Sequence, residues 1–124
     1  MTATPAHAGE SGVTGGGYFT ACVPLACASL NYYYEPSDAL PRSYDAYMTH
    51  IVLTDKVDGD GIWPQLQIKY KNDNSSKWRT VYVHGHDNGE AVLQDNESLF
   101  MVKDVYFRVC SQQNGICKQL AKAN

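Results

Sequence analysis

The chain has 124 residues, of which 44% are hydrophobic, and its formal net charge at pH 7 is −3. This length predicts a single domain with a buried core, and the hydrophobic fraction excludes disorder over the whole chain. The acidic balance argues against a nucleic-acid partner, which requires a basic surface, and no apolar run approaches the roughly 18 residues of a membrane span.

The N-terminal residues are mostly small. Residues 2–8 end in Ala-x-Ala, the pattern that signal peptidase cleaves. We interpret this start as a signal-peptide remnant, which predicts a secreted, extracellular protein. Residues 1–17 contain little that could be buried and end in three successive glycines. They predict a flexible arm that precedes a folded domain over residues 18–124.

The four cysteines form two close pairs, Cys22 with Cys27 and Cys110 with Cys117. An even count without the spacing of a zinc site predicts two local disulfides, which persist in oxidising compartments. On the chain-entropy model, closing loops of this size contributes roughly 2–2.5 kcal/mol each.

From residue 30 onward, apolar and polar residues alternate with the period of two that is typical of β-strands. Clusters of Asp, Gly, Asn, Ser and Pro interrupt the alternation and predict turns. The pattern predicts an all-β fold, a single antiparallel β-sandwich or small barrel of about seven short strands. The predicted strands are residues 30–35, 46–53, 62–70, 78–83, 99–102, 105–110 and 116–120.

Two loops contain residues that could bind a metal. His84 and His86, with Asp87 and Glu90 close by, are the residue types of a zinc or copper site, and alternate residues of an extended segment point the same way. They lack a convincing fourth ligand, so we interpret this segment as a polar hairpin loop.

The turn at residues 55–61 is rich in Asp and Gly, which suggests calcium. Its spacing does not fit an EF-hand: with Asp58 and Asp60 at the first and third loop positions, the fifth falls on Ile62. We interpret the segment as an acidic turn and predict neither a metal nor another cofactor.

The sequence contains no familiar catalytic motif such as Gly-x-Ser-x-Gly or a P-loop. The disulfides would occupy every cysteine, which removes a thiol nucleophile. A nuclease-like set could be assembled from His50, His84 and Arg108, but any chain of this size offers as much. We predict that the protein is not an enzyme.

The first disulfide ring is the strongest candidate binding feature. It encloses Pro24, which excludes an ordinary central strand, and it presents apolar residues next to the arm. A rigid loop binds with little ordering cost; the alternative is that the ring plugs one end of the sandwich. The run from Tyr32 to Tyr34 also has two interpretations, core and sheet surface or a binding patch. The predicted partner-binding residues are Gly15, Gly16, Gly17, Tyr18, Phe19, Val23, Pro24 and Leu25.

Residues 55–117 carry a combination of short motifs: Asp58-x-Asp60-Gly61 before an alternating strand, Trp78 opening the next strand, a polar loop with glycine, and Arg108-Val109-Cys110 followed by Cys117. In these motifs the chain resembles a class of small secreted actinobacterial β-sandwich proteins. It is similar among them to the adaptor subunit of umbrella toxin particles, whose extended N-terminal arm links a toxin protein's stalk to lectin-bearing subunits. The resemblance implies an adaptor role for residues 9–17 and 18–28. The chain departs from it in having few arginines and more Lys and Asn.

We therefore predict a secreted, non-catalytic module that binds another secreted protein, as an adaptor subunit in an extracellular toxin assembly. One alternative is an inhibitor of a protease or other hydrolase, with the loop between Cys22 and Cys27 as the inserting element. A second alternative is a carbohydrate-binding module, which requires Trp63 and Trp78 to be exposed together on one face.

Overall fold

The computed structural model describes residues 15–38, 43–72, 76–111 and 115–123, and these residues form β-strands, turns and loops without a helix. No helix in this part of the chain could therefore cross a membrane. The strands are β1 (Gly15–Val23), β2 (Ala26–Pro36), β3 (Tyr44–Asp55), β4 (Pro64–Asn72), β5 (Trp78–His84), β6 (Ala91–Leu93), β7 (Glu97–Ser111), β8 (Ile116–Cys117) and β9 (Ala121–Lys122).

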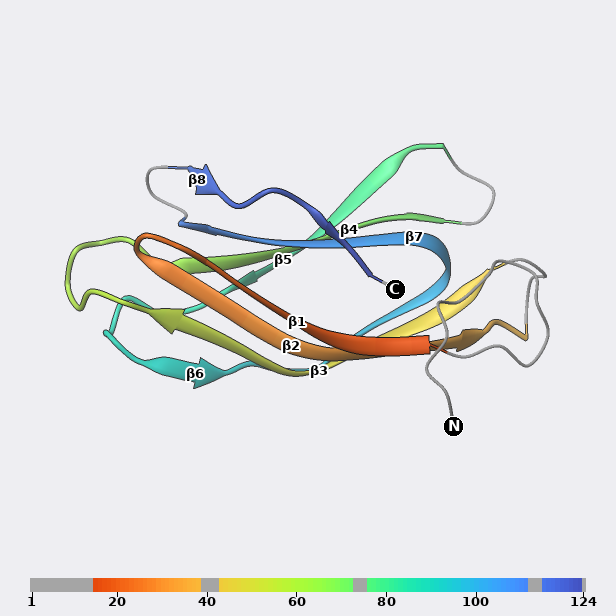
Figure 1. Ribbon diagram of the computed structural model, residues 1–124, viewed down its shortest axis with the longest axis horizontal. Coiled ribbons are helices and arrows are strands. Elements are labelled where there is room, and N and C mark those ends of the chain that lie inside the picture. Colours follow the sequence, from red (N-terminus) through yellow and green to blue (C-terminus); the bar gives the residue numbers. More distant parts are fainter. Residues whose placement is uncertain (1–14, 39–42, 73–75, 112–114, 124) are drawn as a thin grey trace.

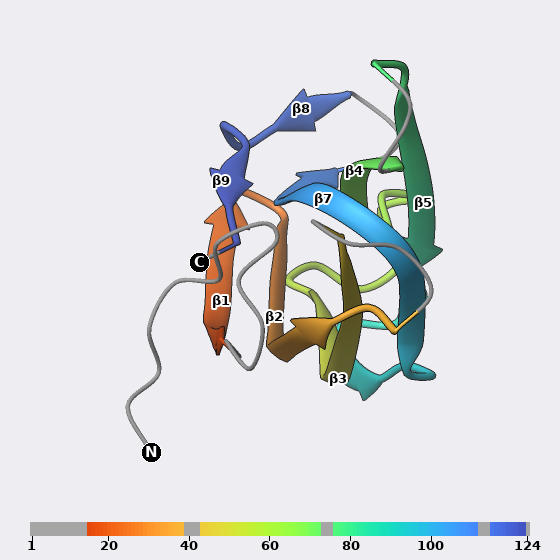
Figure 2. The same ribbon diagram turned by 90° about the vertical axis from the view of Figure 1, so that its right-hand side faces the viewer.

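The strands pair into one antiparallel sheet in the order β1-β2-β3-β7-β4-β5 (Figure 1). β6 adds to β3, and β8 and β9 add to β7. The sheet curls into a half-barrel, so that β1, β2 and β3 face β4, β5 and the second half of β7 (Figure 2). The predicted all-β, antiparallel class is confirmed, but the two layers are the two ends of one curled sheet rather than separate sheets.

Strand β7 joins the two layers, because its first half pairs with β3 and its second half with β4. At the corner between the halves, Met101 has a positive φ of 56°. Its backbone N–H donates a 3.1 Å hydrogen bond to the Asp45 carboxylate, and the strand registers shift on both sides. Such a bulge bends a strand sharply. The two strands predicted at 99–102 and 105–110 are therefore one bent strand.

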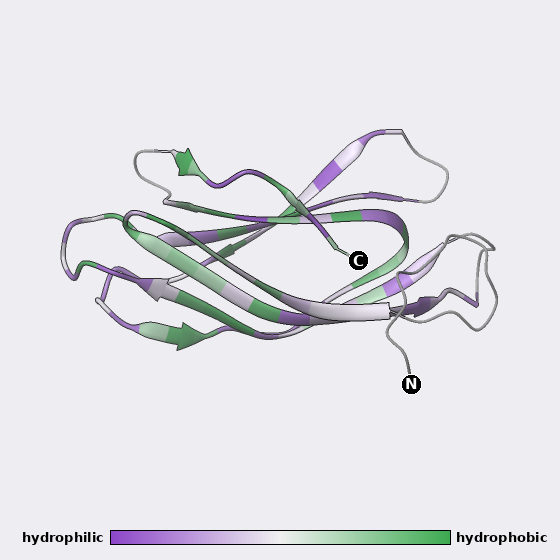
Figure 3. Ribbon diagram, in the orientation of Figure 1, coloured by the Kyte–Doolittle hydropathy of each residue, from purple (hydrophilic) through white to green (hydrophobic). Residues whose placement is uncertain are grey.

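The core lies between the two layers and is filled by alternate residues of the long strands. Figure 3 shows hydrophobic and hydrophilic residues interleaved along these strands, as a sheet with one buried face requires. Phe107 lies at the centre, with its ring centroid 5.4 Å from that of Phe19 and 5.2 Å from that of Tyr32. The largest fully buried side chains include Phe107, Leu30, Met48, Ile51, Leu53, Leu66, Ile68, Val102 and Val109.

The glycine run is not part of an arm. Gly15, Gly16 and Gly17 begin β1 and lie opposite Tyr34, Tyr33 and Tyr32 of β2, whereas residues 1–14 of the predicted arm lie outside the described residues. A Cβ at Gly16 would lie 2.6 Å from the Tyr32 carbonyl oxygen and 3.0 Å from the Tyr33 Cβ. A Cβ at Gly17 would lie 2.9 Å from the Tyr32 hydroxyl oxygen, so Gly16 and Gly17 leave the room that Tyr32 and Tyr33 of the paired strand occupy.

We expect Gly16→Ala to lower the free energy of unfolding by roughly 1–2 kcal/mol, because overpacking forces the backbone to shift. Urea denaturation measures the difference. Thr20→Ala, at an exposed position of the same strand, should change stability by less than about 0.5 kcal/mol. A Gly16→Ala protein as stable as the parent would show that the close approach of β1 and β2 is not required.

Both predicted disulfides are present. Each joins residues that lie directly opposite each other in an antiparallel pair, with Cα atoms 4.1 Å apart in the first and 4.0 Å apart in the second. The first closes the tight turn between β1 and β2, and Pro24 occupies this turn rather than a strand. The pattern is compatible with an oxidising environment.

Candidate functional site

The register of β5, β4 and β7 places polar and aromatic side chains together on the face that points away from the core. We call this the outer face. Residues opposite each other in antiparallel strands lie side by side on the same face. The rows across the three strands are His84, Gln65 and Cys110; Tyr82, Gln67 and Arg108; Thr80, Lys69 and Tyr106; and Trp78, Lys71 and Asp104.

Three large aromatic residues are exposed on or beside this face: Trp63 at 38%, Trp78 at 41% and Tyr82 at 55%. Trp63 lies in the loop just before β4, and its ring centroid is 5.6 Å from that of His84 at the end of β5. Trp78 begins β5, and the Tyr82 ring lies between, 6.5 Å from His84. The aromatic rings therefore follow β5 from one end to the other.

A chain of hydrogen bonds fixes the polar groups at the centre of the outer face. Arg108 Nε donates to Gln67 Oε1 at 2.7 Å, Gln67 Nε2 donates to Gln65 Oε1 at 2.8 Å, and Gln65 Nε2 lies 2.8 Å from His84 Nε2. Arginine can only donate, so the direction of the whole chain is set by Arg108. His84 Nε2 is then the acceptor, and the neutral imidazole carries its proton on Nδ1.

The opposite end of the outer face is held by ring contacts. The Trp78 ring centroid lies 5.4 Å from that of Tyr106 at an interplanar angle of 71°, and the Lys71 ammonium lies 4.6 Å above the Trp78 ring. Edge-to-face and cation–π contacts of this kind restrict the indole without covering it. Trp78 is thus an exposed ring in a defined position.

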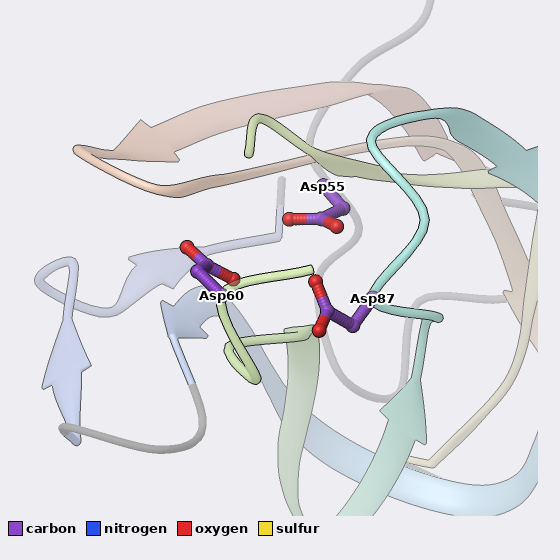
Figure 4. A group of neighbouring side chains, drawn as sticks. All are labelled: Asp55, Asp60 and Asp87. Atoms are coloured by element: carbon purple, nitrogen blue, oxygen red, sulfur yellow. The ribbon is translucent and has the colours of Figure 1, made fainter. Parts of the chain in front are cut away.

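The carboxylates of Asp55, Asp60 and Asp87 lie where the loop after β3, which leads to Trp63, meets the loop after β5 (Figure 4). Asp87 accepts hydrogen bonds from the N–H groups of Gly59 at 3.0 Å and Gly61 at 2.6 Å. Buried Asp55 accepts one from Gly89 at 2.9 Å and one from Val57 at 3.3 Å. We interpret this arrangement as a connection that holds the loop carrying Trp63 against the sheet.

Asp55, Asp60 and Asp87 each offer an oxygen within 4.8 Å of the others, a set of hard ligands that could hold a calcium or magnesium ion. The sequence interpretation placed Asp87 with His84 and His86 and missed its approach to the acidic turn. Within the described residues His84 and His86 belong to no group of three potential ligands. The usable signal was that both loops are rich in Asp and Gly.

The nuclease-like set is not assembled. His84 and Arg108 share the outer face and are connected through the two glutamines, but His50 lies on β3 in the other layer. Its positive φ of 51° coincides with a shift in the register between β2 and β3. His50 is therefore explained as an exposed bulge residue.

The predicted partner-binding residues divide between the core and the surface. Phe19 and Val23 are buried in the core, so they are not available to a partner. Leu25 is half-buried, and its carbonyl oxygen accepts a 3.2 Å hydrogen bond from the Lys56 N–H. Tyr18 and Pro24 are exposed. The disulfide ring thus presents a short, tied-down turn rather than a loop of apolar side chains.

A second aromatic cluster, which we call the tyrosine patch, consists of Tyr33, Tyr47 and Phe100 on the outside of the other layer. The Tyr33 and Tyr47 rings stack with centroids 4.9 Å apart, and Phe100 meets Tyr47 edge-on at 6.2 Å. Desolvation, followed by the charges of Asp45 and Glu35, raises the pKa of Tyr47. In the tyrosine run, Tyr32 and Tyr34 are buried and Tyr33 is exposed, so the run alternates between core and sheet surface, and the binding patch stays a prediction.

The pKa of Glu97, at the start of β7, is raised above its ordinary value of 4.5 by desolvation and then by the charge of Asp95. A group with a raised folded-state pKa stabilises the fold at low pH, and this contribution is lost as the pH rises through that pKa. We expect Glu97→Gln to be more stable than the parent at pH 7 by roughly 0.5 kcal/mol or less, since exposed charges are screened. At pH 3.5 the parent and the Glu97→Gln variant should have the same melting temperature. A difference of the same size at both pH values would contradict the assignment.

No known protein family, curated protein or solved structure matches this chain.

Proposed function

We propose that this protein is an extracellular, non-catalytic module that binds a polysaccharide through its outer face. The observation that carries the proposal is the joint exposure of Trp63 and Trp78 on this face, with Tyr82 between them. The faces of a sugar ring are lined by C–H groups that stack on an aromatic ring. The six residue steps from Trp78 to His84 span about 20 Å at ~3.4 Å per residue, enough for several sugar units.

The polar groups between the rings support the same ligand. Sugar hydroxyls need hydrogen-bonding partners in fixed positions. Gln65 and Gln67 are buried, and they hold the more accessible ends of the chain, Arg108 and His84, in place before any ligand arrives. Rigid aromatic rings also lose little entropy on binding, because each has only two side-chain torsions. Preorganisation of this kind lowers the cost of binding an exposed polymer.

Stacking rings with nearby cations also suit single-stranded nucleic acids. The two disulfides favour a compartment outside the cytosol. This observation favours the polysaccharide, and an oligonucleotide belongs in the test as a competing ligand.

Affinity electrophoresis through gels that contain soluble polysaccharides tests the proposal. At least one polymer should retard the parent protein, and Trp63→Ala, Trp78→Ala and Tyr82→Ala should each weaken that binding about tenfold (~1.4 kcal/mol) or more. Phe100→Ala, which removes an exposed ring from the tyrosine patch, is the matched control and should bind like the parent. Binding that survives all three substitutions, or binding to an oligonucleotide alone, would refute the proposal.

A protein partner is the second candidate, and the tyrosine patch is the feature that favours it, because tyrosine is enriched at protein interfaces. Co-purification of a secreted protein that is lost in Phe100→Ala and retained in Trp78→Ala would support this candidate. The adaptor role in a toxin assembly stays a prediction. An inhibitor role for the first ring is weakened by the burial of Val23 and the anchoring of Leu25.

A further inference from the structure

The outer face carries positive charge on a protein that is negative as a whole. The chain has 13 acidic and 10 basic residues. The register nevertheless places Lys69, Lys71 and Arg108 on the outer face, and β9 adds Lys122 beside Tyr106. The four rows of residues across β5, β4 and β7 contain one carboxylate, that of Asp104. Such a separation of charges marks a surface for a ligand of opposite sign.

Within the described residues, Lys69 and Arg108 have neither a countercharge nor a ring contact. Among the described residues the one ion pair joins Lys122 to Asp104 at 4.0 Å, and the Lys71 ammonium lies over the Trp78 ring. The Lys69 ammonium has no hydrogen bond or ion pair within the described part of the chain. Arg108 uses only its Nε–H there, in the bond to Gln67, so its terminal amino groups remain for a ligand.

The free cations lie between the exposed rings. Lys69 is in the row between those of Tyr82 and Trp78, and Arg108 is in the same row as Tyr82 on the neighbouring strand. The guanidinium is held in place by Gln67, so it can present two parallel donors to an oxyanion. The carboxylates of Asp55, Asp60 and Asp87 gather instead beyond the Trp63 end, each already bonded to backbone N–H groups.

From this geometry we propose that the ligand of the outer face is an acidic polysaccharide, and that Lys69 and Arg108 bind its anionic oxygens while Tyr82 and Trp78 stack on its sugar rings. The proposal rests on the polysaccharide-binding function and adds the charge of the ligand. A uronate carboxylate and a phosphodiester offer the same chemistry, an anionic oxygen attached to a sugar chain. Because Lys69 lies in the row next to that of Trp78, we expect the anionic group of the ligand to bind nearer to Trp78 than to Trp63.

Polygalacturonate and its methyl ester form a matched pair of probes, because they share one backbone and differ in charge. Poly(glycerol phosphate) represents the phosphodiester source. Titration calorimetry should show about tenfold or tighter binding to one of the two charged polymers than to the ester, and the affinity should fall as salt is raised. Whichever charged polymer binds more tightly identifies the source of the anion.

The variants Lys69→Gln and Arg108→Gln should weaken binding to the charged polymer by about tenfold and leave binding to the neutral ester unchanged. Lys56→Gln, at an exposed position outside the outer face, is the control and should match the parent. Equal affinity for charged and neutral polymers, with the tryptophan variants still defective, would overturn the charge assignment and leave polysaccharide binding intact. No binding to any polysaccharide would overturn both.

Discussion

Replacing Phe107 with alanine is expected to lower the free energy of unfolding by about 3–5 kcal/mol. Phe107 is 1% exposed, lies on the second half of β7, and packs against Phe19 of β1 and Tyr32 of β2. Its ring therefore connects the two layers of the half-barrel across the core. Alanine would remove contacts to both, and the curled backbone around the cavity is constrained by pairing on both edges of β7.

Phe100, also on β7 but 55% exposed, offers a matched control. Guanidinium denaturation of both alanine variants should show a large loss at position 107 and a change within about 0.5 kcal/mol at position 100. Comparable losses at the two positions would mean that the layers are not held together through the Phe107 ring.

Asp55→Ala should cost about 2–3 kcal/mol, the second largest effect that we expect. The Asp55 carboxylate is buried and accepts the backbone N–H groups of Val57 and Gly89, which belong to two loops far apart in the sequence. Alanine would leave both donors without their partner. Because these loops lie next to Trp63, the variant should also weaken polysaccharide binding.

Asp58→Ala is the control for this substitution, because Asp58 belongs to the same loop and is exposed; it should be close to neutral. The melting temperatures of the parent in EDTA and in calcium should agree, since we assign Asp55 the role of a loop connector. A calcium-dependent rise in melting temperature that disappears in Asp55→Ala would show instead that the three aspartates bind a cation.

The features that depend on neighbours in the sequence could be predicted. The cysteine pairs are five and seven residues apart, and the alternation over residues 62–70 correctly places Leu66 and Ile68 in the core. The bend of β7 could not be predicted from the sequence. It depends on a hydrogen bond from the Met101 backbone N–H to the Asp45 carboxylate, which is 56 residues away. Glycines usually indicate flexibility, so the pairing of Gly15, Gly16 and Gly17 with tyrosines was also missed.

The candidate site was largely hidden in the sequence for the same reason. Gln67 and Arg108 are 41 residues apart, and they meet only because β4 pairs with β7. Their register is decided by the packing of the whole core rather than by either strand alone. The sequence could supply only a requirement for carbohydrate binding, namely that Trp63 and Trp78 are exposed together on one face. Both side chains are exposed in the structure.

The position of the disulfides at opposite residues of tight hairpins has a consequence for biogenesis. Four cysteines allow three pairings, and here the native pairing requires only two local hairpins, of a kind that forms in microseconds. The long-range pairing of β7 with β3 and β4 is not needed before oxidation. Folding of this chain therefore needs an oxidant, but little correction of mispaired cysteines.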